Sequence, residues 1–179
     1  MVFNNKTALA TCFFLLLGQQ INAKITLPKL FADHAVLQRD VEVPVWGWAS
    51  PGEQVTVQIA GQTVKTTAGK AGDWKIKLAP HTAGGPFEIT ITGKDTLVLK
   101  DIFFGEVWLC TGQSNMQWTL RDFGIKADSV RDNLPELRLF GVWFDLDYLP
   151  KKDVKNGWWQ VASVETVGGF SATAYLFGR

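Results

Sequence analysis

The chain has 179 residues, of which 46% are apolar and 20% are charged, a composition typical of a globular protein with room for one good-sized core or two modest ones. Its 18 basic and 17 acidic residues leave almost no net charge. Because binding to a phosphate backbone depends on an excess of basic side chains, the composition argues against a nucleic-acid-binding protein.

The first 23 residues have the layout of a secretory signal peptide. Lys6 supplies a positive start, residues 8–17 form an apolar run, and Ala23 offers a small residue for cleavage. The run is shorter than the roughly 20 residues that span a bilayer, so no membrane span is expected after cleavage. A buried N-terminal helix is the alternative, but the segment is not amphipathic. We therefore expect export to a periplasm or the extracellular space, or, in a eukaryote, secretion or delivery to the lysosome.

Cleavage after Ala23 would remove Cys12 and leave Cys110 as the single cysteine, so no internal disulfide is expected. Cys110 lies in an apolar run and is predicted to be a small buried hydrophobic residue; a nucleophilic role is the alternative, although no histidine is near it in sequence. One cysteine and two histidines supply a zinc site poorly. The sequence thus predicts neither a metal nor an organic cofactor.

Residues 24–100 alternate between apolar and polar positions, as strands with one buried face do. Turn-forming residues separate these segments at Pro51-Gly52, at Gly61-Gln62, and within residues 69–72 and 84–86. The pattern predicts an antiparallel β-sandwich over residues 24–100. The alternating apolar residues are Val41, Val43 and Val45; Val55, Val57 and Ile59; Trp74, Ile76 and Leu78; and Phe87, Ile89 and Ile91.

From Asp101 the pattern changes. Residues 102–110 form a nearly continuous apolar run, which is typical of a strand buried on both faces of a parallel sheet. The region predicts the start of an α/β domain over residues 101–179, of the flavodoxin-like three-layer type, that is incomplete at its C-terminus because an open parallel sheet needs further strands. The other expected elements are a helix at 115–123, a buried strand at 137–144, a short strand at 158–162, and a helix that carries Phe170, Ala174 and Phe177 on one face.

The stretch LCTGQSNMQW, residues 109–118, contains the candidate site. In one interpretation Ser114 caps a helix, with Gln117 completing a capping box, and this arrangement is very common. In the other, Ser114 stands where a strand meets a helix, so that its hydroxyl faces a crevice and nearby backbone N–H groups can bind an oxyanion. Such a serine becomes a nucleophile only when a base activates it.

The GQSNM motif resembles the nucleophile block of SGNH-type hydrolases. More narrowly, residues 25–179 resemble the N-terminal portion of the sialate O-acetylesterase family. The matching segments are LFADHAVLQ (30–38), VWGWA (45–49), GDW (72–74), DI (101–102) with GEVWLCTGQSNM (105–116), and GFSA (169–172) with FGR (177–179).

This resemblance implies removal of O-acetyl groups from sialic acids or related acetylated sugars, with Ser114 as the nucleophile. Gln113 and Asn115 are weaker candidates for lining the substrate site or the oxyanion hole. In the family the catalytic Asp and His lie far downstream of the serine, whereas His34 and His81 both precede it here. We therefore expect this chain alone to be inactive. The resemblance implies no partner besides the sugar substrate and says nothing of oligomeric state.

Two further groups of residues raise alternatives. Asp101 and Glu106 flank the apolar run but are not paired by sequence alone, and Asp145, Asp147 and Asp153 fall in a polar stretch that we expect to be a solvated loop. The tryptophan pairs Trp46/Trp48 and Trp158/Trp159 raise a second function, a carbohydrate-binding β-sandwich without catalysis. Most tryptophans, however, anchor cores.

Overall fold

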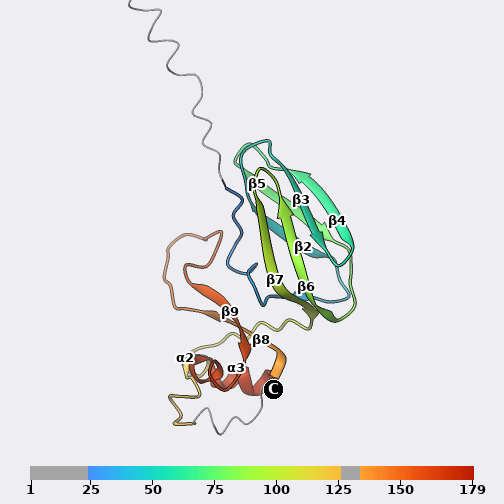
Figure 1. Ribbon diagram of the computed structural model, residues 1–179. Helices are drawn as coiled ribbons and strands as arrows, with labels where there is room; N and C mark the ends of the chain where they lie inside the picture. The colour runs from blue at the N-terminus through green and yellow to red at the C-terminus, as the bar shows by residue number, and fades with distance from the viewer. Residues whose placement is uncertain (1–23, 126–133) are drawn as a thin grey trace, which may run out of the picture.

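The computed structural model describes residues 24–125 and 134–179 (Figure 1). Residues 24–105 form a strand-rich unit, here called the β body. Residues 106–125 and 134–179 form the C-terminal region, which contains a two-stranded hairpin and short helices. The predicted signal peptide lies outside the described residues.

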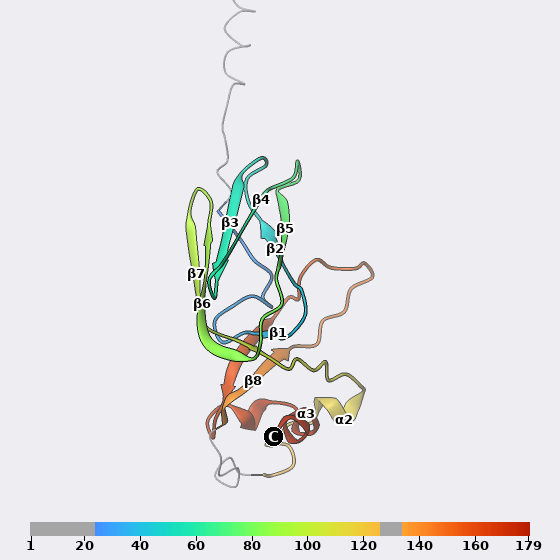
Figure 2. The ribbon, with the colours of Figure 1, turned by 90° about the vertical axis from the view of Figure 1, so that its right-hand side faces the viewer.

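The β body contains a five-stranded sheet and a separate two-stranded sheet. The larger sheet has the order β1-β7-β6-β3-β4, and the smaller one pairs β2 with β5. Figure 2 shows the sheets curling around a common interior. The strands of this unit are β1 (Val36–Gln38), β2 (Val43–Trp48), β3 (Gln54–Ile59), β4 (Gln62–Thr67), β5 (Asp73–Leu78), β6 (Gly84–Thr92) and β7 (Thr96–Gly105).

One pairing departs from the expected antiparallel arrangement. β1 runs parallel to β7, with Val36 opposite Phe103, whereas the other pairs in the β body are antiparallel. The large sheet is therefore mixed. The parallel pairing brings residues 33–36 beside residues 100–103, since the His34 N–H donates to the Lys100 carbonyl at 3.0 Å.

The alternating residues predicted for the β body face its core. On β3 the side chains of Val55, Val57 and Ile59 are buried, while Gln54 and Gln58 are exposed. Trp74, Ile76 and Leu78 on β5 and Ile89 and Ile91 on β6 are buried in the same cluster. Val41 is an exception, because it precedes β2 and is exposed.

The β3–β4 turn lies one residue earlier than expected. Ala60 and Gly61 both have positive φ, 47° and 77°, and Gln62 already belongs to β4. Two-residue hairpin loops with positive φ at both positions match the twist of the flanking strands, and glycine adopts this conformation at no steric cost.

The C-terminal region has a smaller core. It contains α2 (Ser114–Gln117), β8 (Leu134–Val142), β9 (Gly157–Ala162), the 3₁₀ helix η3 (Val167–Gly169) and α3 (Ala172–Gly178). β8 and β9 pair as an antiparallel hairpin. The core of the C-terminal region comprises six buried residues, Leu120, Leu139, Ala162, Val167, Ala172 and Tyr175.

The predicted buried strand at residues 102–110 is wrong. Its first part belongs to β7, where Ile102 and Phe104 point into the core of the β body, and the strand ends at Gly105. Beyond Gly105 the chain has no regular structure until α2, Leu109 is 90% exposed, and Cys110 is exposed rather than buried. β7 also crosses the predicted domain boundary at residues 100–101.

The expected strands at 137–144 and 158–162 are present as β8 and β9, but they differ in environment. They are antiparallel, and only Leu139 and Ala162 of the hairpin are buried. Trp143 and Phe144 lie beyond the end of β8 and are exposed. Among the described residues of this region, no two strands pair in parallel.

The two expected helices also differ in detail. α2 has four residues instead of nine, because Trp118 adopts an extended conformation (φ −64°, ψ 126°). α3 is present, but its buried residues are Ala172, Ala174 and Tyr175, while Phe177 is exposed. Of the three residues predicted to share one face, Ala174 is buried and Phe170 is partly buried just before the helix, so the prediction is wrong for Phe177. None of the helices that the structure describes is long and apolar enough to cross a membrane.

Candidate active site

The GQSNM segment forms a single solvent-facing helical turn. Ser114 is the first residue of α2, and the Met116 N–H donates to the Gln113 carbonyl at 2.9 Å. Gln113, Ser114 and Asn115 are all exposed. A Cβ atom on Gly112 would lie 2.7 Å from the Met116 side chain, so glycine permits the close return of the chain at this point.

The capping-box interpretation of Ser114 is wrong. The N-cap position of α2 belongs to Gln113, whose side chain makes no capping hydrogen bond, and Ser114 stands inside the helical turn. The Ser114 hydroxyl makes no hydrogen bond to any other described residue. Ser114 is thus an exposed residue whose hydroxyl has no hydrogen-bond partner within residues 24–125 and 134–179.

α3 holds this turn in place. The Thr173 hydroxyl donates to the Asn115 carbonyl at 3.2 Å, and the Ala172 N–H donates to the Trp118 carbonyl at 2.9 Å. A side-chain cap does form on α3, where Ser171 accepts from the Ala174 N–H. Figure 1 shows α2 and α3 side by side below the hairpin.

Neither histidine is placed to act on Ser114. The Nδ1 atom of His34 lies 2.6 Å from an Asp101 carboxylate oxygen, and that of His81 lies 2.6 Å from the Thr82 carbonyl. The His81 ring also stacks on Phe104, with ring centroids 4.5 Å apart. Both rings contact residues of the β body, and neither is hydrogen-bonded to Ser114 among the described residues.

An ionic cluster that sequence reasoning missed joins the β body to the hairpin. The Arg138 guanidinium donates to both Asp101 carboxylate oxygens, at 3.2 and 3.1 Å, while His34 contacts the same carboxylate. The Arg138 side chain is only 3% exposed, and its guanidinium lies over the Phe103 ring at 4.7 Å. The residues are separated by 37 and 67 positions, and only the parallel β1–β7 pairing and the hairpin bring them together.

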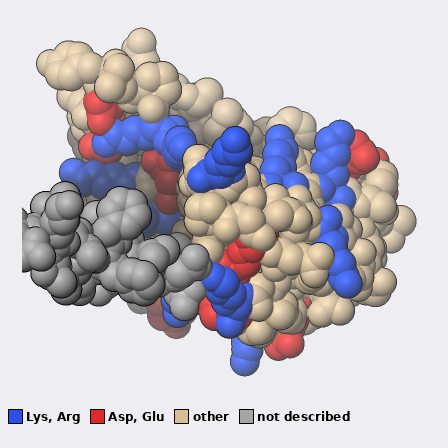
Figure 3. Space-filling model, turned by 90° about the horizontal axis from the view of Figure 1, so that it is seen from above, with Lys and Arg blue, Asp and Glu red and all other residues tan. Residues whose placement is uncertain are grey.

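The other carboxylates named from the sequence form ordinary surface pairs. Arg39 donates to Glu106 at 2.7 Å, and this hydrogen bond lowers the pKa of Glu106. Lys151 lies 2.7 Å from Asp147 and 3.3 Å from Asp145, and its hydrogen bond lowers the pKa of Asp147. Among residues 24–125 and 134–179, no three potential metal-ligating side chains come together. On the face seen in Figure 3, basic and acidic side chains both occur.

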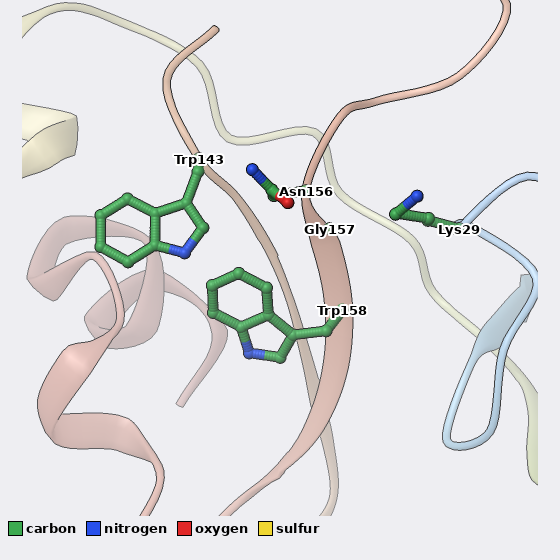
Figure 4. A pocket seen from close by; sticks show the side chains of 5 residues that line it. All are labelled: Lys29, Trp143, Asn156, Gly157 and Trp158. Carbon is green, nitrogen blue, oxygen red and sulfur yellow. The ribbon is translucent and has the colours of Figure 1, made fainter.

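Some of the tryptophans are packed and others are exposed. Trp46 packs edge-on against Phe31, with centroids 4.8 Å apart, and Trp159 packs against the core of the β body and donates its indole N–H to the Leu30 carbonyl. Trp143 and Trp158 are instead exposed and line an open cavity together with Lys29, Asn156 and Gly157 (Figure 4). Trp46 is therefore used for packing within the β body, which argues against a sugar-stacking role for its ring.

Comparison with known proteins identifies relatives. No family model matches the chain. The mouse sialate O-acetylesterase is 33% identical over 82% of this chain and 31% of its own length, and the human sialate O-acetylesterase is 41% identical over 48% of this chain and 18% of its own length. The crystal structure of XAC1771, a carbohydrate acetylesterase from Xanthomonas citri, superimposes with a TM-score of 0.82 at 38% identity, covering 86% of this chain and 36% of that one.

The strand-rich, curled mixed sheet is consistent with a carbohydrate-esterase-like fold. More narrowly, the chain is a relative of the sialate O-acetylesterases. The chain spans about a third of the length of the mouse and rat sialate O-acetylesterases.

Proposed function

We propose that this chain contributes the nucleophile of a carbohydrate O-acetylesterase, and that the nucleophile is Ser114. The observation that carries the proposal is the exposure of Ser114 within the GQSNM turn, where its hydroxyl makes no hydrogen bond to another described residue. The similarity to a carbohydrate acetylesterase and to proteins named sialate O-acetylesterase supports it.

In the proposed reaction the Ser114 hydroxyl attacks the acetyl carbonyl of an O-acetylated sugar, such as a sialic acid or a related acetylated sugar. A base accepts the serine proton, the sugar hydroxyl leaves with a proton, and water then hydrolyses the acetyl-enzyme. The backbone N–H of Ser114 supplies part of an oxyanion hole. The exposed side chains of Gln113 and Asn115 flank the nucleophile, where they would contact the sugar. Ester hydrolysis of this kind requires no metal or organic cofactor.

The proposal also covers the domain that contains Ser114 and the source of the base that activates it. We place Ser114 at the start of an SGNH-type α/β hydrolase domain and interpret the β body as a β-sandwich that supports it. His34 and His81 are engaged elsewhere, so the Asp–His pair would come from sequence outside residues 24–179. The 179-residue chain alone should then show no Ser114-dependent turnover. Export through the N-terminal signal peptide belongs to the same proposal.

Active-site labelling of a chimera tests the assignment. Residues 24–179 would replace the matched segment of the Xanthomonas citri carbohydrate acetylesterase, which supplies the remaining sequence. A fluorophosphonate probe should label Ser114, as located by peptide mass spectrometry, and Ser114→Ala should abolish labelling. Ser163→Ala, at another serine of the C-terminal region, is the matched control and should keep it. Labelling at a different residue, or labelling that survives Ser114→Ala, would refute the role of Ser114.

A further inference from the structure

One face of the β8–β9 hairpin carries two tryptophans and an asparagine. Gly141 of β8 pairs with Trp158 of β9, and the Trp143 N–H donates to the Asn156 carbonyl at 3.3 Å two positions further on. Because side chains alternate along a strand, Gly141, Trp143, Asn156 and Trp158 share a face. Trp159 points to the other face, where it contacts the β body.

This shared face is covered at one end and open at the other. Near its covered end, Leu139 is buried in the cluster that contains Tyr175 of α3. At the open end Trp143 is 65% exposed and Trp158 is 41% exposed. The open end therefore presents two large apolar rings to solvent next to a packed and rigid support.

The support fixes the orientation of Trp158. A Cβ atom on Gly141 would lie 3.4 Å from the Trp158 ring, so the indole covers the glycine with no side chain between them. The Trp143 and Trp158 ring centroids lie 6.1 Å apart, with their planes tilted by 37°. Figure 4 shows the two indoles on the same side of β9, and because their planes are tilted we describe the cavity that they line as a shallow trough.

Polar groups complete the cavity. It has a volume of about 410 Å³ and is lined by Lys29, Trp143, Asn156, Gly157 and Trp158. This volume falls in the range of small-molecule sites, which are typically apolar with a few polar groups. Lys29 comes from the β body, and its ammonium lies 3.9 Å from Asp153, too far for a hydrogen bond, so it keeps N–H donors for a ligand. Lys29 is the one charged side chain among the residues that line the cavity, and Asp153 lies outside this lining.

We propose that this trough binds a single pyranose ring of a carbohydrate. One face of a pyranose presents C–H groups, which pack against the electron-rich face of an indole. The ring hydroxyls at its edge would then meet the Asn156 amide and the Lys29 ammonium. The site does not involve Ser114, so it goes beyond the proposed esterase activity and stands or falls separately from it.

Titration of the full chain with sugars, followed by the NMR signals of the tryptophan indole N–H groups, tests the proposal. The probes are the methyl β-glycosides of glucose, galactose and N-acetylglucosamine, with sorbitol as an open-chain polyol that has no ring face. At least one glycoside should shift the Trp143 and Trp158 signals saturably, whereas sorbitol should not. No saturable shift with any glycoside, or an equal shift with sorbitol, would overturn the proposal.

Matched variants locate the binding. Trp143→Ala should weaken glycoside binding roughly tenfold or more, because one wall of the trough is lost, and Trp143→Phe should restore part of it. Trp118→Ala removes a comparably exposed indole, 49%, outside the cavity and should leave binding unchanged. Binding that survives Trp143→Ala, or that is lost in Trp118→Ala, would contradict the assignment. Labelling of Ser114 in the chimera reports separately on the esterase proposal, because each of these variants leaves Ser114 intact.

Discussion

The β body and the C-terminal region use apolar residues in different ways. In the β body the alternating side chains of β3, β5 and β6 converge on one extensive core. In the C-terminal region six residues form a small core, while Trp108, Leu109, Phe144 and Leu149 face solvent. An apolar sequence therefore predicts burial only where other elements supply the opposite surface.

The continuous run at residues 102–110 shows the difference within a few positions. Ile102 is fully buried between the sheets of the β body, and Leu109 is 90% exposed in the segment that leads to Ser114. Both residues fit a buried strand when considered by sequence alone. The boundary between them is Gly105, where β7 ends.

The largest expected effect on the free energy of unfolding comes from Ile102, which is buried in the β body. Ile102→Ala should lower the free energy of unfolding by about 2–5 kcal/mol, because it removes buried methylene groups and leaves a cavity. Leu109→Ala should change it by less than about 0.5 kcal/mol, as is usual for exposed positions. Urea denaturation of both variants measures the contrast. Equal losses would mean that Leu109 is buried in solution and that the two regions do not differ as described.

A smaller effect is expected where the two regions meet. Asp101→Asn should destabilise the protein by about 1–3 kcal/mol, because the nearly buried Arg138 guanidinium loses its charged partner. Asp101 has a φ of 56°, and asparagine tolerates this left-handed conformation, so the substitution tests the charge rather than the backbone.

Hydrogen exchange locates that effect. Amides of β8 and β9 should exchange faster in Asp101→Asn, whereas amides of β3 should not, if the ion pair holds the hairpin to the β body. Asp153→Asn, at a more peripheral contact between hairpin and body, serves as the control and should have a smaller effect. Unchanged exchange in β8 and β9 would show that the ion pair does not join the regions.

The stability of the β body is also expected to depend on pH through Glu53, a buried carboxylate. The Lys94 backbone N–H, and then the Ser50 N–H, donate to Glu53 at 2.6 and 2.9 Å and lower its pKa, against the opposing effect of burial. A lowered folded-state pKa stabilises the protein above the unfolded value of about 4.3, and this contribution is lost as the pH falls through the folded value.

Glu53→Gln should therefore destabilise the protein by about 1–2 kcal/mol at neutral pH, since a charged acceptor of two hydrogen bonds is lost. It should also flatten the fall in stability below about pH 4.3. Asp147→Asn, at an exposed pair of the C-terminal region, should change the pH profile much less. Urea midpoints measured between pH 3 and pH 7 test both statements. Parallel pH profiles for wild type and Glu53→Gln would contradict the role of Glu53.

The sequence predicted the strands and buried faces that depend only on the local alternation of apolar and polar residues. Val55, Val57 and Ile59 alternate with polar residues, and their burial follows directly from a strand with one face on a core. The spacing of apolar residues also predicted a helix near residue 174, but the burial of Tyr175 depends on where Leu120 and Leu139 lie, and spacing within one helix does not record that.

The candidate site shows the same limit. The motif predicted Ser114 at the start of a helix, but the local pattern also favoured a side-chain cap that does not form, because Gln113 and not Ser114 holds the N-cap position of α2. The His34–Asp101–Arg138 cluster carries no local signal, because its members meet only through the pairing of β1 with β7 and through the hairpin.

Acetate release by the chimera with the Xanthomonas citri enzyme tests the central claim most directly. The account predicts turnover of an O-acetylated sugar by the chimera, a loss on the order of 10⁶-fold in kcat on Ser114→Ala, and no Ser114-dependent turnover by the 179-residue chain alone. Full activity of the Ser114→Ala chimera would contradict the claim that this exposed hydroxyl attacks the ester.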